Sequence, residues 1–317
     1  MEIVYGREII PGSNPGPTAS CKRKFGAKLK GMWFLFAFLT AFFESLKDVF
    51  SKKSLKKADE YIVSWSLRFF ALPFLIPLLF FIEIPSLGNQ FWIALFVGGS
   101  LNVITTILYM KAIKHSDLSI TVPMVTFTPL FLLLTSPLIV GEFPSLFGFI
   151  GVLLIVLGSY TLNIKQRHAG YLAPFKTLLK EKGPKLMLLV AFIWSITSNF
   201  DKIGVLNSSP IFWVIAINIF ITLTLLPIML YKSRGSIQQI LISHRTLLPI
   251  GLFSALSLIF QMTAISLTLV AYVISIKRTS VVMTVLFGYL IFKEKGIKER
   301  LVGAVIMVIG VLFIVLS

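Results

Sequence analysis

AYVISIKRTSVVMTVLFGYLIFKE, residues Ala271–Glu294, is 24 residues long and almost wholly apolar. A run of about 20 apolar residues is long enough to cross a bilayer core as a helix. Two adjacent cations, Lys277 and Arg278, interrupt the run about a third of the way along. Because a charged side chain inside a membrane helix is costly, it is expected to face a cavity or a counter-ion. The segment therefore predicts a membrane helix that borders a polar interior.

The composition of the whole chain is typical of a membrane protein. Of its 317 residues, 56% are hydrophobic and only 14% are charged, and the mean hydropathy is +0.89. Soluble domains carry about 25% charged residues, so we predict an all-α integral protein of the plasma or inner membrane, embedded in lipid. The net charge of +17 does not indicate nucleic-acid binding, because the basic residues lie in short loops between apolar runs.

Ten apolar spans follow a polar tail. The tail, residues 1–31, is rich in turn formers and basic residues. We expect it to be disordered, or to precede a true start at Met32. Several spans are joined by very short connections, which make neighbouring helices pack antiparallel. The predicted spans are 33–50, 61–82, 91–110, 118–139, 145–164, 186–206, 211–231, 247–268, 270–292 and 301–316.

The second half of the chain repeats the first. The pattern Ala-Phe-x2-Ser-x4-Phe-x-Lys begins at residue 41 and recurs 150 residues later, and Ala-Ile at 112–113 recurs 152 residues later. The motif Glu-x8-Gly-x6-Gly begins at Glu142 and again at Glu294. Because five spans is an odd number, the two halves must insert with opposite orientation, as in many secondary transporters that bind substrate between inverted repeats. The predicted organisation is a first five-helix repeat at 32–164, a basic loop at 165–185 and a second five-helix repeat at 186–317.

The distribution of basic residues predicts the orientation. The loops after spans 1, 3, 5, 7 and 9 together contain 19 Lys and Arg residues, whereas the other loops contain almost none. Positively charged loops are retained in the cytoplasm, so both termini are predicted to lie outside. The six basic residues of the N-terminal tail oppose this orientation unless the protein starts at Met32.

At these residues the chain resembles the drug/metabolite transporter superfamily, in particular its ten-span EamA-type members, which consist of two five-span repeats. The motifs are Gly141-Glu142, the two copies of Glu-x8-Gly-x6-Gly, and the AIKRTS-like residues Ser275–Ser280. The resemblance covers residues 33–317 and implies a secondary transporter or exporter of small metabolites that works by alternating access. Members handle amino acids, nucleotide sugars, sugar phosphates, drugs and lipid-linked sugars, so the fold does not fix the substrate. Members usually have cytoplasmic termini, whereas the loop charges of this chain predict that both termini lie outside.

The first span carries charged residues on one helical face. Glu44, Lys47 and Asp48 are spaced i, i+3 and i+4, which brings them together on a helix. Glu44-x7-Lys52 is similar to the small multidrug resistance branch of the superfamily, which implies a glutamate shared by proton and substrate. The alternative is a structural pair of Glu44 with Lys47 or Arg68 that only neutralises buried charge.

Lys277 and Arg278 are the stronger candidates for substrate binding. Adjacent residues project about 100° apart on a helix, so one can face the cavity while the other pairs elsewhere. A guanidinium binds carboxylate or phosphate through two hydrogen bonds. The alternative is that both pair with Glu44, Asp48 or Asp201 as a packing contact. Cations exceed carboxylates by six to three among the charged residues in the spans, which favours an anionic or zwitterionic substrate.

The sequence therefore predicts an exporter of a small anionic or zwitterionic metabolite, such as an amino acid, without enzymatic activity. It predicts no cofactor and leaves coupling to protons open. The alternatives are a cation or multidrug exporter that uses Glu44, a lipid-linked sugar flippase, and a membrane protein that transports nothing. No metal site is predicted, since the chain has one cysteine and its three histidines share no ligand spacing. A monomer suffices because both repeats lie in one chain, and a homodimer is also compatible. The predicted substrate-binding residues are Lys277, Arg278, Glu44, Lys47, Asp48, Arg68, Asn102, Trp194, Asn199 and Gln261.

Overall fold

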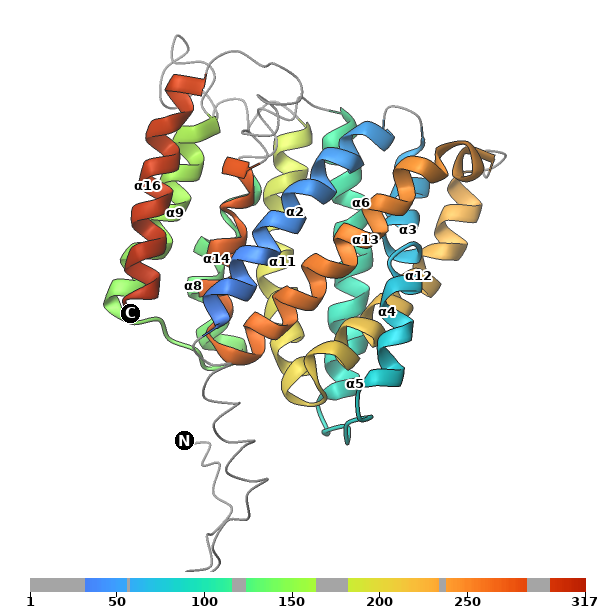
Figure 1. Ribbon diagram of the computed structural model, residues 1–317, viewed down its shortest axis with the longest axis horizontal. Helices are drawn as coiled ribbons and strands as arrows, with labels where there is room; N and C mark the ends of the chain where they lie inside the picture. The colour runs from blue at the N-terminus through green and yellow to red at the C-terminus, as the bar shows by residue number, and fades with distance from the viewer. Residues whose placement is uncertain (1–31, 56–57, 116–123, 164–181, 234–237, 284–296) are drawn as a thin grey trace, which may run out of the picture.

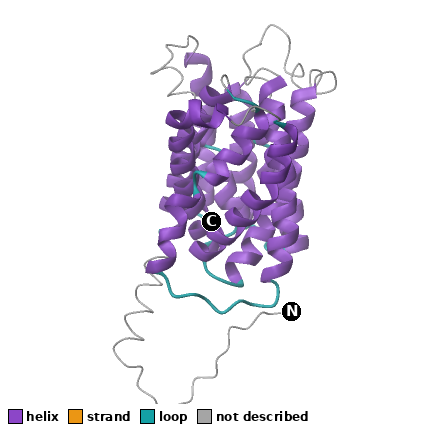
Figure 2. Cartoon of the chain, turned by 90° about the vertical axis from the view of Figure 1, so that its right-hand side faces the viewer, coloured by secondary structure: helices purple, strands orange, loops and turns teal. Residues whose placement is uncertain are grey.

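The computed structural model describes residues 32–55, 58–115, 124–163, 182–233, 238–283 and 297–317. These residues form a bundle of helices and contain no β-strand (Figures 1 and 2). The predicted tail and most of the predicted inter-repeat loop lie outside the described residues. The described elements are α2 (Trp33–Leu55), α3 (Glu60–Phe69), α4 (Leu72–Leu75), the 3-10 helix η1 (Ile76–Phe81), α5 (Phe91–Ile93), the π-helix η2 (Ala94–Gly98), α6 (Gly99–His115), α8 (Thr128–Ile139), α9 (Leu146–Asn163), α11 (Lys182–Leu206), α12 (Pro210–Lys232), α13 (Gln238–Leu267), α14 (Val270–Lys277) and α16 (Ile297–Val315).

Five of the described helical segments are long and apolar enough to cross a membrane, and three shorter segments are also apolar. The five are Glu60–Phe81, Phe91–Lys114, Lys182–Leu206, Pro210–Lys232 and Leu247–Leu267, and the three are Thr128–Ile139, Leu146–Thr161 and Val302–Val315. α2 has 23 residues but includes the charged face predicted for the first span. α14 has eight residues, and the described part of the chain continues from it to residue 283. The all-helical membrane class is therefore confirmed, while the count of ten spans stays a prediction.

Helices that the sequence repeat relates run in opposite directions. α2 begins, and its counterpart α11 ends, at the end of the bundle where α16 reaches the C-terminus (Figure 1). The main helix contacts join the two halves: α2 packs on α13, α6 on α11, and α9 on α16. The repeat relates α2 to α11 and α13 to α6, so the first contact corresponds to the second. It also relates α9 to α16, so the third contact joins a helix to its own counterpart. This arrangement is what two inverted five-helix repeats require.

Glycines let α9 and α16 approach closely. A Cβ atom added at Gly151 would lie 2.6 Å from the backbone oxygen of Gly310, and one at Gly310 would lie 2.7 Å from the backbone oxygen of Gly151. A Cβ at Gly158 would likewise lie 2.7 Å from the backbone oxygen of Gly303. Small residues at helix crossings in membranes permit this backbone contact. The repeated Gly-x6-Gly motif is therefore explained by packing between the halves.

Replacement of Gly151 by valine is expected to separate α9 from α16. The new side chain meets backbone atoms, which can yield only by moving a helix, and overpacking of this kind typically costs about 1–3 kcal/mol. We expect a lower melting temperature of the purified protein. Leu157→Ala is the control, because Leu157 lies on the same helix and is 55% exposed. Equal effects of the two substitutions would contradict the close contact.

A polar cluster ties two connections to α11 at one end of the bundle. Glu142, between α8 and α9, lies with Oε1 3.1 Å from Lys202 Nζ of α11, and its Oε2 accepts the Val270 N–H at 2.8 Å. Lys202 also donates to the carbonyl oxygens of Ile265 and Thr268, at 2.6 and 2.9 Å. The cluster therefore joins the connection after α8, the end of α11 and the turn between α13 and α14.

A second polar cluster lies outside the apolar part of α3, at its first turn. Asp59 caps α3 by accepting the Tyr61 N–H at 2.9 Å, and it also accepts from Ser233 Oγ at 3.2 Å. Lys114 contacts both Asp59 and Glu60. Partial burial raises the pKa of Asp59, but the hydrogen bond from Tyr61 and the nearby Lys114 charge outweigh burial and hold this pKa below its ordinary value. The charged cap fixes where α3 begins relative to α6 and α12.

Candidate functional site

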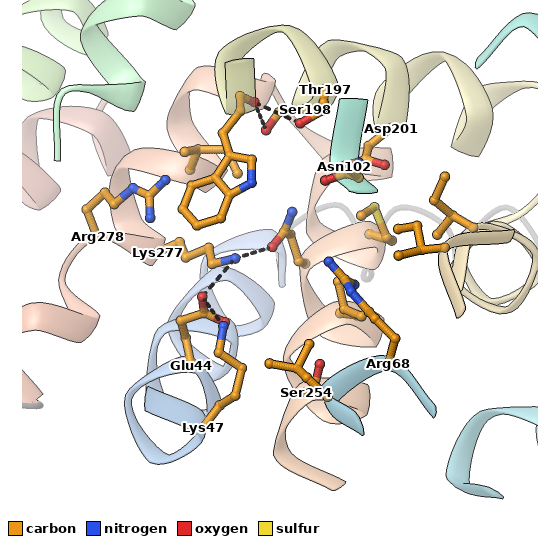
Figure 3. A pocket seen from close by; sticks show the side chains of 18 residues that line it. Glu44, Lys47, Arg68, Asn102, Thr197, Ser198, Asp201, Ser254, Lys277 and Arg278 are labelled. Carbon is orange, nitrogen blue, oxygen red and sulfur yellow. Dashed lines mark hydrogen bonds and ion pairs between the residues drawn. The ribbon is translucent and has the colours of Figure 1, made fainter. Parts of the chain in front are cut away.

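A polar cavity of about 90 Å³ lies inside the bundle, between helices of both halves (Figure 3). A buried water needs about 10–15 Å³ of such space, so the cavity has room for several waters or one small metabolite. Side chains from α2, α3, α6, α11, α12, α13 and α14, together with Arg278 directly after α14, surround it. The lining residues are Glu44, Lys47, Leu67, Arg68, Asn102, Trp194, Thr197, Ser198, Asp201, Ile217, Ile221, Ser254, Leu258, Gln261, Met262, Ile274, Lys277 and Arg278.

Glu44 is the centre of an ion cluster on one wall. Its Oε1 lies 2.6 Å from Lys47 Nζ and 3.4 Å from Lys277 Nζ, while its Oε2 accepts from Ser257 Oγ at 3.0 Å. Lys277 also donates to Gln261 Oε1 at 2.8 Å. The carboxylate is only 7% exposed. One buried carboxylate thus neutralises part of the charge of two lysines from different halves.

Arg278 is held beside this cluster by neutral groups. Its Nη2 donates to Thr128 Oγ1 at 2.9 Å, and the guanidinium carbon lies 5.4 Å from the ring centre of Trp194. Trp194 in turn packs on Tyr109, with ring centres 5.3 Å apart. Arg278 is 6% exposed and its Nε has no hydrogen-bond partner among the described residues. A guanidinium positioned by a ring and a hydroxyl, without a described carboxylate at ion-pair distance, is suited to bind an acidic ligand.

The opposite wall carries Arg68 and Asp201. Within the part of the chain that the structure describes, the side chain of Arg68 makes no hydrogen bond and no ion pair, and its Nε is buried without a partner. Asp201 Oδ1 accepts from the indole Nε1 of Trp213 at 3.0 Å, and the residue is 7% exposed. Figure 3 shows Arg68 on the other side of Lys277 from Arg278. The cavity therefore has cationic groups on two sides.

The structure brings together eight of the ten residues that the sequence predicts for substrate binding. Asn199 does not line the cavity: it is fully buried and bonds to Ser136 Oγ and Thr135 Oγ1 across the contact of α11 with α8. Asp48 lies 3.7 Å from Lys47 and does not line the cavity either. The eight are Glu44, Lys47, Arg68, Asn102, Trp194, Gln261, Lys277 and Arg278.

The sequence prediction missed one polar face of α11. Trp194, Thr197, Ser198 and Asp201 all line the cavity, yet only Trp194 was predicted to bind substrate and Asp201 was considered only as a counter-ion. Their spacing of i, i+3, i+4 and i+7 is that of one helical face, which is the signal that identifies them. Ser254 of α13 is a further lining residue that the prediction lacked. No group of three metal-ligating side chains occurs among the described residues.

Comparison with known proteins places the chain in a family. The model of the EamA-like transporter family matches residues 31–164 and again residues 181–316. The chain belongs to the EamA-like transporter family. This EamA-like protein is thus a membrane transporter of the drug/metabolite superfamily type, as the sequence resemblance predicted.

The other comparisons show similarity of fold and do not indicate a substrate. A solved structure titled "Crystal structure of protein" matches the EamA-like chain with a TM-score of 0.69 and 14% sequence identity, over 89% of this chain and 95% of that one. At this identity the similarity shows the fold alone. No curated protein matches the chain.

Proposed function

We propose that this EamA-like transporter moves a small metabolite with an acidic group, either an anion or a zwitterion such as an amino acid. Lys277 and Arg278 bind the acidic group, and Glu44 balances their charge or exchanges a proton. The cavity lies between the two inverted halves, which is where alternating access places a substrate. Among the described residues, four cations and two carboxylates line it, and this excess of positive charge supports the proposal most directly.

The buried position of Arg278 adds to this support. Removing a guanidinium from water costs several kcal/mol unless a partner compensates it, and the only described partners of Arg278 are Thr128 and the ring of Trp194. A carboxylate or phosphate would supply the missing partner. By contrast, Glu44 is already bonded to two lysines and Ser257, so a cationic substrate would have to displace them.

Direction and orientation are part of the same proposal. The loops after the odd-numbered predicted spans contain 19 Lys and Arg residues, which places them in the cytoplasm of a plasma-membrane protein with both termini outside. Export of the metabolite out of the cell, coupled to proton entry, is the transport mode that we propose. Solute flux in liposomes, driven by a pH gradient of either sign, tests both direction and coupling.

Substitution of Lys277 by glutamine is expected to abolish ligand stabilisation. A ligand present at 100 times its Kd stabilises the folded protein by about 2.7 kcal/mol, so carboxylates or phosphates should raise the melting temperature of the wild type. Loss of the Lys277 charge should remove most of this shift. Lys232→Gln is the control, because Lys232 is exposed at the end of α12.

Melting temperatures measured with a panel of anionic, zwitterionic and cationic metabolites and lipid-linked sugars decide between the proposal and its alternatives. Stabilisation by cations alone, lost in Glu44→Gln, would replace the proposal by a cation or multidrug exporter. Stabilisation by lipid-linked sugars alone would indicate a flippase. Absence of both stabilisation and flux across the panel would contradict substrate transport through this cavity.

A further inference from the structure

Two arginines in the cavity lack carboxylate partners, and they come from different halves of the protein. Arg68 lies on α3 and Arg278 directly follows α14. Neither lies within 4.0 Å of a described carboxylate oxygen, and the Nε of each is buried without a hydrogen-bond partner among the described residues. Both line the cavity, on opposite sides of Lys277 (Figure 3). The site therefore offers two separate guanidinium groups to one ligand.

The two lysines of the cavity, unlike the arginines, have a carboxylate at ion-pair distance. Lys47 and Lys277 both contact Glu44, at 2.6 and 3.4 Å. Glu44 balances one of these two lysine charges and Asp48, 3.7 Å from Lys47 Nζ, balances the other. The positive charge that has no described carboxylate at ion-pair distance therefore lies on the two arginines. Asp201 lines the same cavity as Arg68, but its Oδ1 accepts from Trp213 Nε1 at 3.0 Å and it makes no ion pair with Arg68.

The charge balance of the lining indicates the charge of the ligand. Among the described residues, four lining cations against two lining carboxylates leave an excess of two positive charges. Asp48, which contacts Lys47 from outside the cavity lining, reduces but does not remove this excess. A zwitterion would leave the excess unchanged, whereas a ligand with two acidic groups would neutralise the two positive charges of the lining itself.

We infer that Arg68 and Arg278 each bind one acidic group of the same ligand, so that the substrate is a small metabolite with two separated acidic groups. This inference rests on the proposed function and narrows its substrate class. A volume of about 90 Å³ limits the ligand to a small molecule, such as a short dicarboxylate.

The inference is tested with ligands that differ at one end only. Melting temperatures of the purified full-length protein are titrated with straight-chain dicarboxylates of three to six carbons. For each length, the monocarboxylate and the ω-amino acid serve as matched controls. We expect the best dicarboxylate to bind about tenfold to a hundredfold more tightly than both controls, since a hydrogen-bonded charge contributes about 1.5–3 kcal/mol.

The Arg68→Gln variant tests whether Arg68 binds the second acidic group of the ligand. The variant should lose the preference for the dicarboxylate while its affinity for the monocarboxylate stays within about threefold of the wild type. Arg278→Gln should weaken both ligands. Without ligand, Arg68→Gln should melt at or above the wild-type temperature, because removal of an unpaired buried charge relieves a desolvation cost.

Each other outcome overturns a defined part of the argument. Equal binding of dicarboxylate and monocarboxylate, or equal losses of both in Arg68→Gln, would overturn the role of Arg68 while leaving the proposed function intact. Tighter binding of the ω-amino acid would indicate a zwitterionic substrate with its amine at Asp201. A lower melting temperature of unliganded Arg68→Gln would indicate that Arg68 is structural. No stabilisation by any acid would overturn the proposed function together with this inference.

Discussion

Glu44→Gln is expected to destabilise the protein by about 3–5 kcal/mol, and Lys277→Gln in the same chain is expected to restore most of that loss. Lys47 and Lys277 both contact Glu44 Oε1, at 2.6 and 3.4 Å. Loss of the carboxylate leaves two buried ammonium groups without their main partner. Neutralising Lys277 as well leaves Lys47 with Asp48, at 3.7 Å. The measurement is the melting temperature of the single and double variants in detergent.

The double-variant cycle separates the two roles that the sequence leaves open for Glu44. If Glu44 mainly balances charge, the double variant is stable and the single variant is not. If Glu44 is a proton-exchange site that contributes little to stability, Glu44→Gln melts like the wild type but loses proton-driven flux. Glu83→Gln is the matched control, because Glu83 is exposed between η1 and α5.

The membrane class and the two-repeat organisation could be predicted because both depend on patterns along the chain. Hydropathy identifies the spans without knowledge of the packing. The Glu-x8-Gly-x6-Gly motif identifies the repeat, and its glycines prove to be where α9 and α16 touch. Breaks inside the spans were not predicted: the second span continues α3 through α4 into η1, and the third contains the π-helix η2. Such local changes in helix type depend on neighbours that hydropathy does not report.

The cavity could be predicted in part, because charged residues within apolar spans are also a pattern along the chain. Charged residues inside apolar spans must face a polar interior, and Glu44, Arg68, Lys277 and Arg278 do line one cavity. The pairing of Glu44 with Lys47 and with Lys277 was among the alternatives that the sequence left open, and both contacts are present. The hydroxyl partners could not be predicted, because Ser257 bonds to Glu44 from 213 residues away and Thr128 bonds to Arg278 from 150 residues away. Only the fold brings these residues together.

The repeat also contains a pair whose meaning the sequence did not show. Glu142 and Lys202 are the repeat counterparts of Glu294 and Lys52, and no contact between them was predicted, yet in the structure they contact each other at 3.1 Å. Lys202 further bonds to the carbonyl of Ile265, which belongs to the repeated Ala-Ile pair. Three of the repeated elements thus meet in one polar cluster. Glu294 and the side chain of Lys52 lie outside the described residues.

Because of this cluster, Glu142→Gln is expected to cost about 3–5 kcal/mol of stability, the usual effect of removing one partner of a buried ion pair. Lys202 is 8% exposed and would keep only the two carbonyl oxygens as partners, with no charge to compensate its own. Glutamine can still accept the Val270 N–H, so the loss should arise mainly from the charge. The measurement is the melting temperature of the variant beside that of Glu83→Gln.

The double variant Glu142→Gln, Lys202→Gln tests whether the charge is the cause. Removing both charges should recover part of the stability that Glu142→Gln loses, because no buried ammonium group then remains uncompensated. A coupling energy near zero in this cycle would contradict a direct ion pair. The cluster joins the connection after α8 to the turn between α13 and α14. Its weakening should therefore also increase proteolytic cleavage at these two connections, while the ligand-binding residues of the cavity stay unchanged.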